Sequence, residues 1–275
     1  MKIVTSLIVF LLAGFAGLFP VHAGPKPEIS IIIDDLGNNP DIGLGALELP
    51  GNIAYSFLPN TPHATILAEL AHEKGKQVMV HIPMESEHHE KLGPNALLAD
   101  MEEREYKSVL QAALEAVPYA VGLNNHMGSL LTQKEVPMQW LMDVLAEKQL
   151  FFVDSRTTTK TVAQKTAGRM GITTLRRDVF LDNSRDEAAI RLQFVELINI
   201  AKRRGYATGI AHPYPETIMV LKEMLPALEK EGIELVFASD IAMRYPTVNT
   251  AEKSGRTAWQ ESSYHSPRVV KNLKQ

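Results

Sequence analysis

The sequence predicts a parallel α/β fold that closes, or nearly closes, into a barrel. Short apolar runs alternate with amphipathic stretches from Ile29 to Ala238, which is typical of repeated strand–helix units. Most runs lack strict apolar/polar alternation, as expected for strands buried on both faces of a sheet. Seven or eight units favour a barrel over an open doubly wound sheet. No G-x-G-x-x-G turn follows the first run, so a dinucleotide-binding domain loses its main support.

The apolar runs are short and rich in β-branched or aromatic residues, as strands are. The predicted strands are Ile29–Ile33, Ile53–Leu58, Val78–Ile82, Tyr119–Leu123, Leu150–Val153, Gly171–Leu175, Ala207–Ala211 and Glu234–Ala238.

Helices between these strands are predicted from apolar stripes at helical spacing and from their end signals. The predicted end signals are the N-cap pair Thr61-Pro62 with the stop at Gly75, the capping boxes Thr132/Glu135 and Ser184/Glu187, and the stops at Gly205 and Gly232. Pro137 is expected to shift the start of the helix after Thr132.

The N-terminus has the pattern of a secretory signal peptide. Lys2 precedes an apolar stretch from Ile3 to Phe19, and Val21-His22-Ala23 forms a small-residue cleavage site. We expect residues 1–23 to be removed and the protein to be exported across the inner membrane to the periplasm. A retained membrane anchor is the alternative, since about 17 apolar residues lie at the lower edge of spanning length. The predicted organisation is a barrel domain over 24–246 and a flexible polar tail over 247–275.

Charge and cysteine content exclude several classes of function. The formal charge is −4, and removal of residues 1–23, which hold one lysine and no acid, makes it −5. With a net negative charge, the chain lacks the excess of basic residues that is typical of nucleic-acid-binding proteins. Because the chain has no cysteine, any metal site must use His, Asp or Glu.

Polar residues follow nearly every predicted strand, at the barrel end where active sites lie. These residues are Asp34 and Asp35, His81 with Glu85, Asn124-Asn125-His126, Asp154-Ser155-Arg156, Arg176-Arg177-Asp178 with Asp182, His212, and Ser239-Asp240. Three of the nine histidines therefore lie at strand ends on one face. Two aspartates and three histidines at one rim match the needs of a hydrolytic metal site, which takes about three N/O ligands and leaves a position for water.

Each of these residues also has a structural interpretation. An aspartate after a strand is often only an N-cap, and His81 alone fits a hydrogen-bonded barrel residue. The adjacent pair Asp34-Asp35 differs, because two close carboxylates must be neutralised by a cation or share a proton. Arg176 and Arg177 suit either a surface ion pair or an anion clamp, and the sequence does not decide between them.

Five segments in this order resemble the divergent branch of the polysaccharide deacetylase family. They are Asp34-Asp35-Leu36-Gly37, His81-Ile82-Pro83-Met84-Glu85, Asn124-Asn125-His126-Met127-Gly128-Ser129, Val153-Asp154-Ser155 and Ala211-His212-Pro213. The resemblance runs from about residue 28 to 245 and implies a distorted (β/α) barrel of about seven strands, with its catalytic rim at these strand ends.

The resemblance also implies individual roles. Asp34 matches the general base, Asp35 and His126 match metal ligands, and His212 matches the histidine that protonates the leaving amine. The main family places two ligand histidines four residues apart, whereas Gly122 and Leu130 stand four residues either side of His126. We expect His81 to supply the remaining ligand. The expected substrate-binding residues are Asn125, Ser129, Asp154 and Arg156.

The function predicted is that of an exported, metal-dependent hydrolase, with zinc as the expected ion, that removes acetyl groups from a cell-envelope carbohydrate such as a peptidoglycan fragment. Two alternatives stay open. One is a non-catalytic glycan-binding or scaffold protein on the same barrel. The other is a different metal hydrolase such as a phosphoesterase, which Arg176 and Arg177 would suit through their affinity for phosphate.

Overall fold

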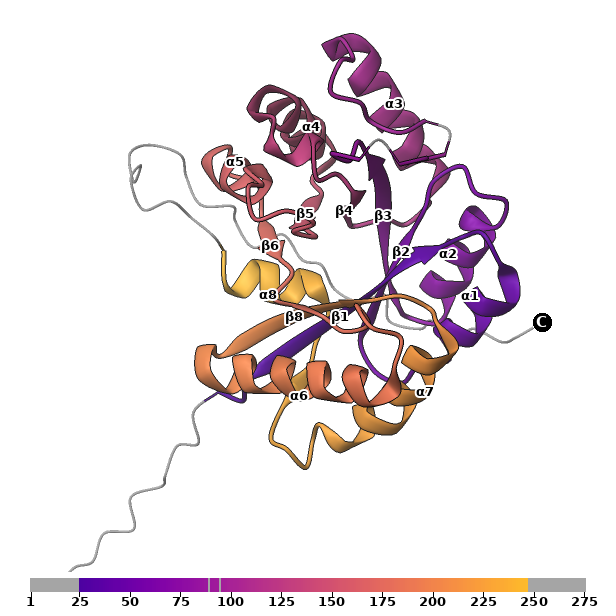
Figure 1. Cartoon of the computed structure of the whole chain (residues 1–275), viewed down its shortest axis with the longest axis vertical. Coiled ribbons are helices and arrows are strands. Elements are labelled where there is room, and N and C mark those ends of the chain that lie inside the picture. Colours follow the sequence, from indigo (N-terminus) through magenta and orange to yellow (C-terminus); the bar gives the residue numbers. More distant parts are fainter. Residues whose placement is uncertain (1–24, 89, 94, 247–275) are drawn as a thin grey trace, which may run out of the picture.

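The computed structural model describes residues 25–246 except 89 and 94. The predicted signal peptide (1–23) and polar tail (247–275) lie outside the described residues. Strands and helices alternate along the chain (Figure 1). Their bounds are β1 Glu28–Leu36, α1 Pro40–Leu47, β2 Ile53–Phe57, α2 Ala64–Glu73, β3 Gln77–Met84, α3 Glu103–Ala116, β4 Gly122–Met127, η1 Leu131–Gln133, α4 Glu135–Lys148, β5 Phe151–Asp154, α5 Ala163–Arg169, β6 Thr174–Arg176, β7 Val179–Phe180, α6 Glu187–Arg204, β8 Tyr206–Ala211, α7 Pro215–Met224, η2 Leu225–Ala227, β9 Glu234–Leu235 and α8 Ala238–Arg244.

All strand pairs within the described residues are parallel, in the order β6-β5-β4-β3-β2-β1-β8-β7, with β9 beside β1. The two ends of this sheet, β6 and β7, are consecutive in the chain. The backbone N–H of Arg177 donates to Asp154 O (2.9 Å) on one side of the gap, and that of Asp178 donates to Thr208 O (2.8 Å) on the other. The sheet therefore curls into a half-barrel whose ends are joined by one kinked segment, which confirms the predicted (β/α) barrel.

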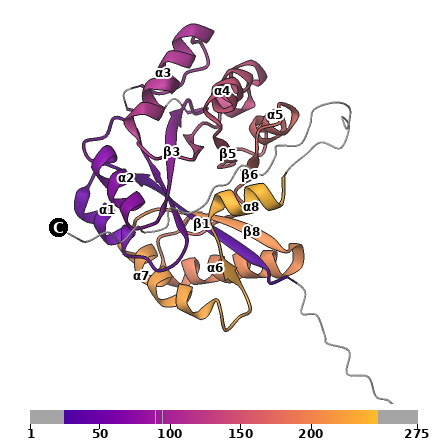
Figure 2. The ribbon, with the colours of Figure 1, turned by 180° about the vertical axis from the view of Figure 1, so that it is seen from behind.

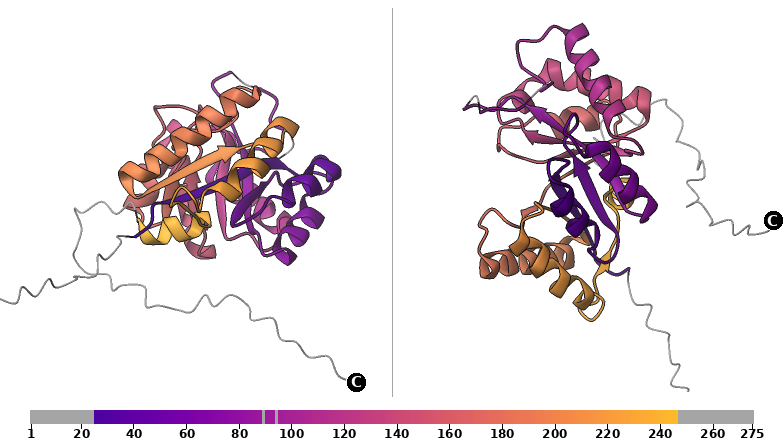
Figure 3. Two further views of the ribbon diagram at one scale, coloured as in Figure 1. Left: turned by 90° about the horizontal axis from the view of Figure 1, so that it is seen from below. Right: turned by 90° about the vertical axis from the view of Figure 1, so that its right-hand side faces the viewer.

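Two apolar cores lie on the two faces of the curled sheet. The larger core packs the outward side chains of the strands against the surrounding helices. Helices α6 and α7 lie at one end of the molecule and α3 and α4 at the other, with the strands between them (Figure 3). The smaller core fills the inside of the barrel. Strands buried on both faces explain why the runs show no strict alternation.

Helix α8 covers the inner core from within the curl of the sheet. Its Ala238, Ile241 and Ala242 pack against inward strand residues such as Ile32 and Met79, and Figure 2 shows α8 beside β1 and β6. Polar pairs fix it in place: Arg244 Nη1 lies 2.6 Å from Glu28 Oε1, and Gln77 Nε2 donates to Ser239 Oγ at 2.6 Å. Among the described residues, no helix is long and apolar enough to cross a membrane.

The predicted strands are all present, but several boundaries and caps differ. The last predicted run holds only β9, and Ala238 already begins α8. The three predicted N-cap hydroxyls do not cap helices. Thr61 Oγ1 donates to Leu58 O and Thr132 Oγ1 to Gly128 O, while Asp186 rather than Ser184 caps α6 through the N–H of Ala189. The predicted stop at Gly205 is confirmed by its left-handed backbone.

Candidate metal centre and catalytic site

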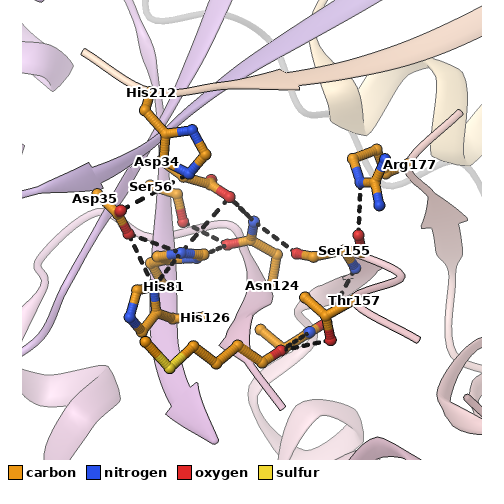
Figure 4. A network of polar contacts seen from close by, with 12 residues as sticks. Asp34, Asp35, Ser56, His81, Asn124, His126, Ser155, Thr157, Arg177 and His212 are labelled. Carbon is orange, nitrogen blue, oxygen red and sulfur yellow. Dashed lines mark hydrogen bonds and ion pairs between the residues drawn. The ribbon is translucent and has the colours of Figure 1, made fainter. Parts of the chain in front are cut away.

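The polar rim continues the inward-facing rows of the barrel by one more step. Side chains of a strand alternate between its two faces, so residues two apart point the same way. The inward apolar residues are Ile32, Ala54, Met79, Val153, Leu175 and Ile210. The residues two positions further along each strand are Asp34, Ser56, His81, Ser155, Arg177 and His212, and Figure 4 shows these six gathered in one network. The barrel thus has an apolar layer below and a polar layer at the carboxyl ends of its strands.

Asp35 would point away from this layer if β1 continued as a regular strand, because it follows Asp34 directly. The chain departs from regularity there: the pairing of β1 with β2 shifts register between Ile33 and Leu36, and Asp35 has a φ of 61°. A left-handed conformation is tolerated by aspartate better than by most residues. This kink turns the Asp35 carboxylate toward the histidines, so adjacent aspartates share one site.

Three side-chain atoms converge on a single point at this rim. Asp35 Oδ1 lies 2.9 Å from His126 Nδ1 and 3.2 Å from His81 Nε2, and the two ring nitrogens are 3.2 Å apart. Ligand atoms around a tetrahedral zinc ion, at about 2.0–2.2 Å from it, lie about 3.3–3.5 Å from one another. Asp35 Oδ1 is also buried and accepts no hydrogen bond. This set of one carboxylate oxygen and two imidazole nitrogens fits a divalent metal.

A second group of contacts surrounds His212, at the end of β8. Its Nδ1 lies 3.0 Å from Asp182 Oδ1, and its backbone N–H donates to Asp182 Oδ2 at 2.6 Å. Asp182 is buried and accepts a further hydrogen bond from Thr217 Oγ1 at 2.9 Å. His212 Nε2 is then left facing the site, 3.7 Å from Asp35 Oδ2. This arrangement fixes the orientation of the ring. It also places a proton on Nδ1, which donates a hydrogen bond to Asp182.

Burial and charge shift the pKa values of the residues at this rim. Burial would lower the pKa of His81, but the charges of Asp34 and Asp35 outweigh it and raise that pKa to about 9. Burial would also lower the pKa of His212, but Asp182 and the carboxylates of the rim outweigh burial and raise that pKa. Burial would raise the pKa of Asp35, yet His126 and His81 hold it well below its ordinary value.

The Asp34 carboxylate is buried, at 2% exposure. Burial raises its pKa against the opposing influence of His81, His212 and the amide of Asn124. A carboxylate with a raised pKa is a better proton acceptor than an ordinary one. Asp34 therefore combines burial, a fixed orientation and increased basicity, which are the properties of a general base.

Comparison with known proteins assigns the chain to a family. Residues 31–242 match the divergent polysaccharide deacetylases. The chain belongs to this family. It is 39% identical over 232 residues to the uncharacterized protein YibQ of Escherichia coli, covering 84% of this chain and 71% of that protein. It is 35% identical over 233 residues to an uncharacterized protein of Haemophilus influenzae, covering 85% and 81%.

Solved structures show the same fold. An uncharacterized protein from Agrobacterium tumefaciens superposes with a TM-score of 0.77 at 22% identity, over 81% of this chain and 92% of that one. A putative cellobiose-phosphate cleavage protein from Enterococcus faecalis does so with a TM-score of 0.58 at 13% identity, over 79% and 100%. The family membership and the barrel inferred from the five sequence segments are thus confirmed.

The four side chains predicted to bind substrate fall into two groups. Asn125 and Asp154 are 1% exposed and hold loop backbone. Asn125 accepts from Ser155 N and donates to Met127 O, while Asp154 accepts from Arg156 N and Thr161 Oγ1. Both therefore hold the loops at the rim through buried hydrogen bonds, and their substrate-binding role stays a prediction.

Ser129 and Arg156 are partly exposed beside the site, so their substrate-binding role stays a prediction. The sequence did not decide whether Arg177 forms a surface ion pair or binds an anion. In the structure it donates through Nε to Ser155 O (2.6 Å) and through Nη2 to Arg156 O (2.8 Å). It holds the loop after β5 on the side of the gap where β5 and β6 pair. Arg176 lies 3.8 Å from Asp178.

Four residues of this polar network were given no role from the sequence: Ser56 was not selected at all, while Asn124, Ser155 and Asp182 were noted only as polar residues at or after strand ends. Ser56, Asn124 and Ser155 lie on the same inward-facing rows as the aspartate and histidines. Counting alternate positions along each strand from the inward apolar residues would have indicated that they face the site. Register gives the same answer, because His81 and Asn124 are paired neighbours on β3 and β4. Asp182 lies in a loop after β7, where no periodicity would indicate it.

Proposed function

We propose that this divergent polysaccharide deacetylase is an exported, metal-dependent hydrolase that removes acetyl groups from a cell-envelope carbohydrate. The observation that carries the proposal is the convergence of Asp35, His81 and His126 on one point, beside the base-like Asp34 and the acid-like His212. The family match supports an acetylated carbohydrate as substrate. The leader-like residues 1–23 support export, and hence an envelope glycan such as a peptidoglycan fragment.

Asp35, His81 and His126 would hold the ion, with zinc as the expected metal for one carboxylate and two imidazoles. When bound, a zinc ion lowers the pKa of water and polarises a carbonyl oxygen.

Asp34 receives the proton of the attacking water. Its two carboxylate oxygens are fixed by the amide of Asn124, each at 2.9 Å from Nδ2, so the carboxylate has a single orientation. As the water oxygen bonds to the acetyl carbon, its proton passes to Asp34. Burial of Asp34 favours this transfer because it destabilises the unprotonated, charged form.

His212 delivers a proton to the departing nitrogen as the carbon–nitrogen bond breaks. The products are acetate and the free amine of the sugar. The raised pKa of His212 favours the protonated ring, and the hydrogen bond from Nδ1 to Asp182 leaves Nε2 as the donor. The base and the acid are separate side chains, so the two proton transfers use different groups.

The proposal predicts the behaviour of Asp35→Asn. The amide that replaces the carboxylate is a poor ligand and no longer compensates the two histidines, so this variant should retain no metal and release no acetate. Wild-type protein should release acetate from N-acetylated peptidoglycan fragments or chitin oligosaccharides and leave phosphate esters intact. Acetate release and metal content are the two readouts, and Asp143→Asn is the matched control, since Asp143 is a partly exposed acid on α4 that pairs with Lys107.

Full acetate release by metal-free Asp35→Asn would contradict the metal-dependent scheme. A wild-type protein that binds the glycan and metal but releases no acetate would point instead to a glycan-binding scaffold. Hydrolysis of phosphate esters in place of acetylated sugars would establish the phosphoesterase alternative.

A further inference from the structure

Asn124 occupies the centre of the polar layer, although it has no charge and is not among the three converging ligand atoms. It is fully buried, on the inward row of β4. Its Oδ1 lies 2.8 Å from His81 Nδ1 and accepts a hydrogen bond from Ser56 Oγ at 2.6 Å. Its Nδ2 donates to both oxygens of Asp34, each at 2.9 Å, and lies 3.3 Å from Ser155 Oγ. One amide thus touches both the ligand His81 and the base Asp34 (Figure 4).

These partners allow only one orientation of the amide. Asp34 accepts hydrogen bonds when ionised, so the group facing it must be the NH₂. If the amide were flipped, its oxygen would face the carboxylate and its NH₂ would face Ser56 and His81. The orientation with Oδ1 toward His81 satisfies all partners at once.

The amide orientation in turn fixes the histidine. Because Oδ1 can only accept, His81 Nδ1 must carry a proton, and a neutral ring then has its lone pair on Nε2. That nitrogen is the one 3.2 Å from Asp35 Oδ1 and 3.2 Å from His126 Nδ1. Hydrogen bonds of this kind to the second ring nitrogen orient metal-binding histidines and increase their basicity, and losing one costs about 10–100-fold in metal affinity or activity.

We infer that Asn124 is a positioning residue that couples the metal centre to the general base: its carbonyl oxygen selects the metal-binding tautomer of His81 while its NH₂ group orients the Asp34 carboxylate. The part of the inference that concerns Asp34 rests on the proposed function. The part that concerns the His81 tautomer does not depend on it. A carboxamide suits this position because it is neutral and both donates and accepts through separate atoms.

Two substitutions separate the two halves. Asn124→Leu fills similar space and removes both contacts, so the Kd for zinc should rise about 10–100-fold and acetate release should be lost. Asn124→Asp keeps an oxygen toward His81 and Ser56 but sets a second oxygen against Asp34. Its Kd for zinc should stay within about 3-fold of wild type or be tighter, since a carboxylate increases ligand basicity, while kcat should fall at least about 100-fold.

The tautomer is measured directly by ¹⁵N NMR of the His81 ring in the full mature chain. In zinc-free protein at pH 10, where the ring is neutral, the shifts should report a proton on Nδ1 for wild type and Asn124→Asp, and no such preference for Asn124→Leu. Asn125→Leu, which removes the neighbouring buried amide, controls for a general loss of packing. It should lower the melting temperature and leave the His81 tautomer as in wild type.

A proton on Nε2 in the wild type, or an unchanged tautomer in Asn124→Leu, would overturn the inference whether or not the protein binds metal. So would a Kd for zinc in Asn124→Leu equal to that of wild type. Wild-type protein that shows the Nδ1 tautomer but binds no zinc and releases no acetate would refute the proposed function and leave the tautomer role of Asn124 standing.

Discussion

His212 depends on its neighbour Asp182 more than on its own position. The ring is largely buried, and burial alone would favour its neutral form. The carboxylate at 3.0 Å from Nδ1 reverses that tendency and keeps the ring able to donate a proton. Asp182 is itself held by the backbone N–H of His212 and by Thr217. The acidity of one side chain therefore rests on a chain of fixed contacts.

Replacing Asp182 by Asn should impair the proton donor while leaving the metal in place. The pKa of His212 falls when the charge is removed, so the protonated form is lost at a lower pH. We expect kcat/KM for acetate release to fall about 100-fold or more, and the alkaline limb of its pH profile to move to lower pH. Thr217→Val, which removes only an outer hydrogen bond, should cost less than about 10-fold. An alkaline limb that does not move in Asp182→Asn would exclude His212 as the acid.

The sequence identified most of the side chains at the rim but not whether each one points into or out of the barrel. Asp34, Asp35, His81, His126 and His212 were all selected because they follow apolar runs. Asn125 was preferred to Asn124, although the alternation that sends His126 inward also sends Asn124 inward and Asn125 outward. Alternation would also have sent Asp35 outward. Only the register shift and left-handed backbone of the structure explain why it faces the histidines.

The turn from β1 to α1 aims Asp35, and its geometry depends on Gly37. This residue has a φ of +120°, and a Cβ built on it would lie 2.0 Å from Thr61 Oγ1 and 3.3 Å from the Cβ of Ala64. Thr61 is unable to yield freely, because its hydroxyl donates to Leu58 O at 2.7 Å. Gly37 therefore allows the start of α2 to pack against this turn.

Gly37→Ala should strain the turn and displace Asp35. We expect the free energy of unfolding in urea to drop by about 1–3 kcal/mol and the Kd for zinc to rise. Gly45→Ala is the matched control, since Gly45 lies in α1 and its added Cβ meets no atom within 4 Å. That change should raise stability by up to about 1 kcal/mol. Equal effects of the two substitutions would show that the turn does not depend on close packing.

Strands were predicted better than helix ends for a physical reason. A strand buried on both faces must be apolar along its length, so the sequence shows it directly. A cap is one hydrogen bond, and the hydroxyls of Thr61 and Thr132 instead bond to carbonyls of nearby turns. Strand β7 has only two residues, too few to form a pattern, and it was not predicted. Strand β9 also has two residues, but it lies within the predicted run Glu234–Ala238.

In the barrel as a whole, the inward residues that stabilise the fold and those that form the site lie in two different layers along the strands. The lower inward layer is apolar and packed against α8, and the upper layer holds the charged rim. Any side chain in the upper layer is surrounded by low-dielectric packing below and beside it, which strengthens each charge interaction. This explains why the pKa values of Asp34, Asp35, His81 and His212 are shifted, whereas the Arg191–Glu223 ion pair between α6 and α7 lies at the surface.

Metal binding by this rim should depend on pH through His81. Its pKa of about 9 in the metal-free protein means that the ring carries an extra proton at neutral pH. Zinc binding must displace that proton, so the apparent affinity should increase about 10-fold per unit of pH from about pH 6 to pH 8 and level off above pH 9. Calorimetric titrations in buffers of different ionisation enthalpy should report about one proton released per zinc at pH 7.

The stoichiometry of that zinc titration is the most direct test of the metal centre. The mature wild-type chain should bind one zinc ion, and Asp35→Asn, His81→Gln and His126→Gln should each abolish binding while remaining folded by circular dichroism. Wild-type protein that takes up no zinc or other divalent ion, or zinc binding that survives all three substitutions, would contradict the assignment of this rim as a metal-dependent active site.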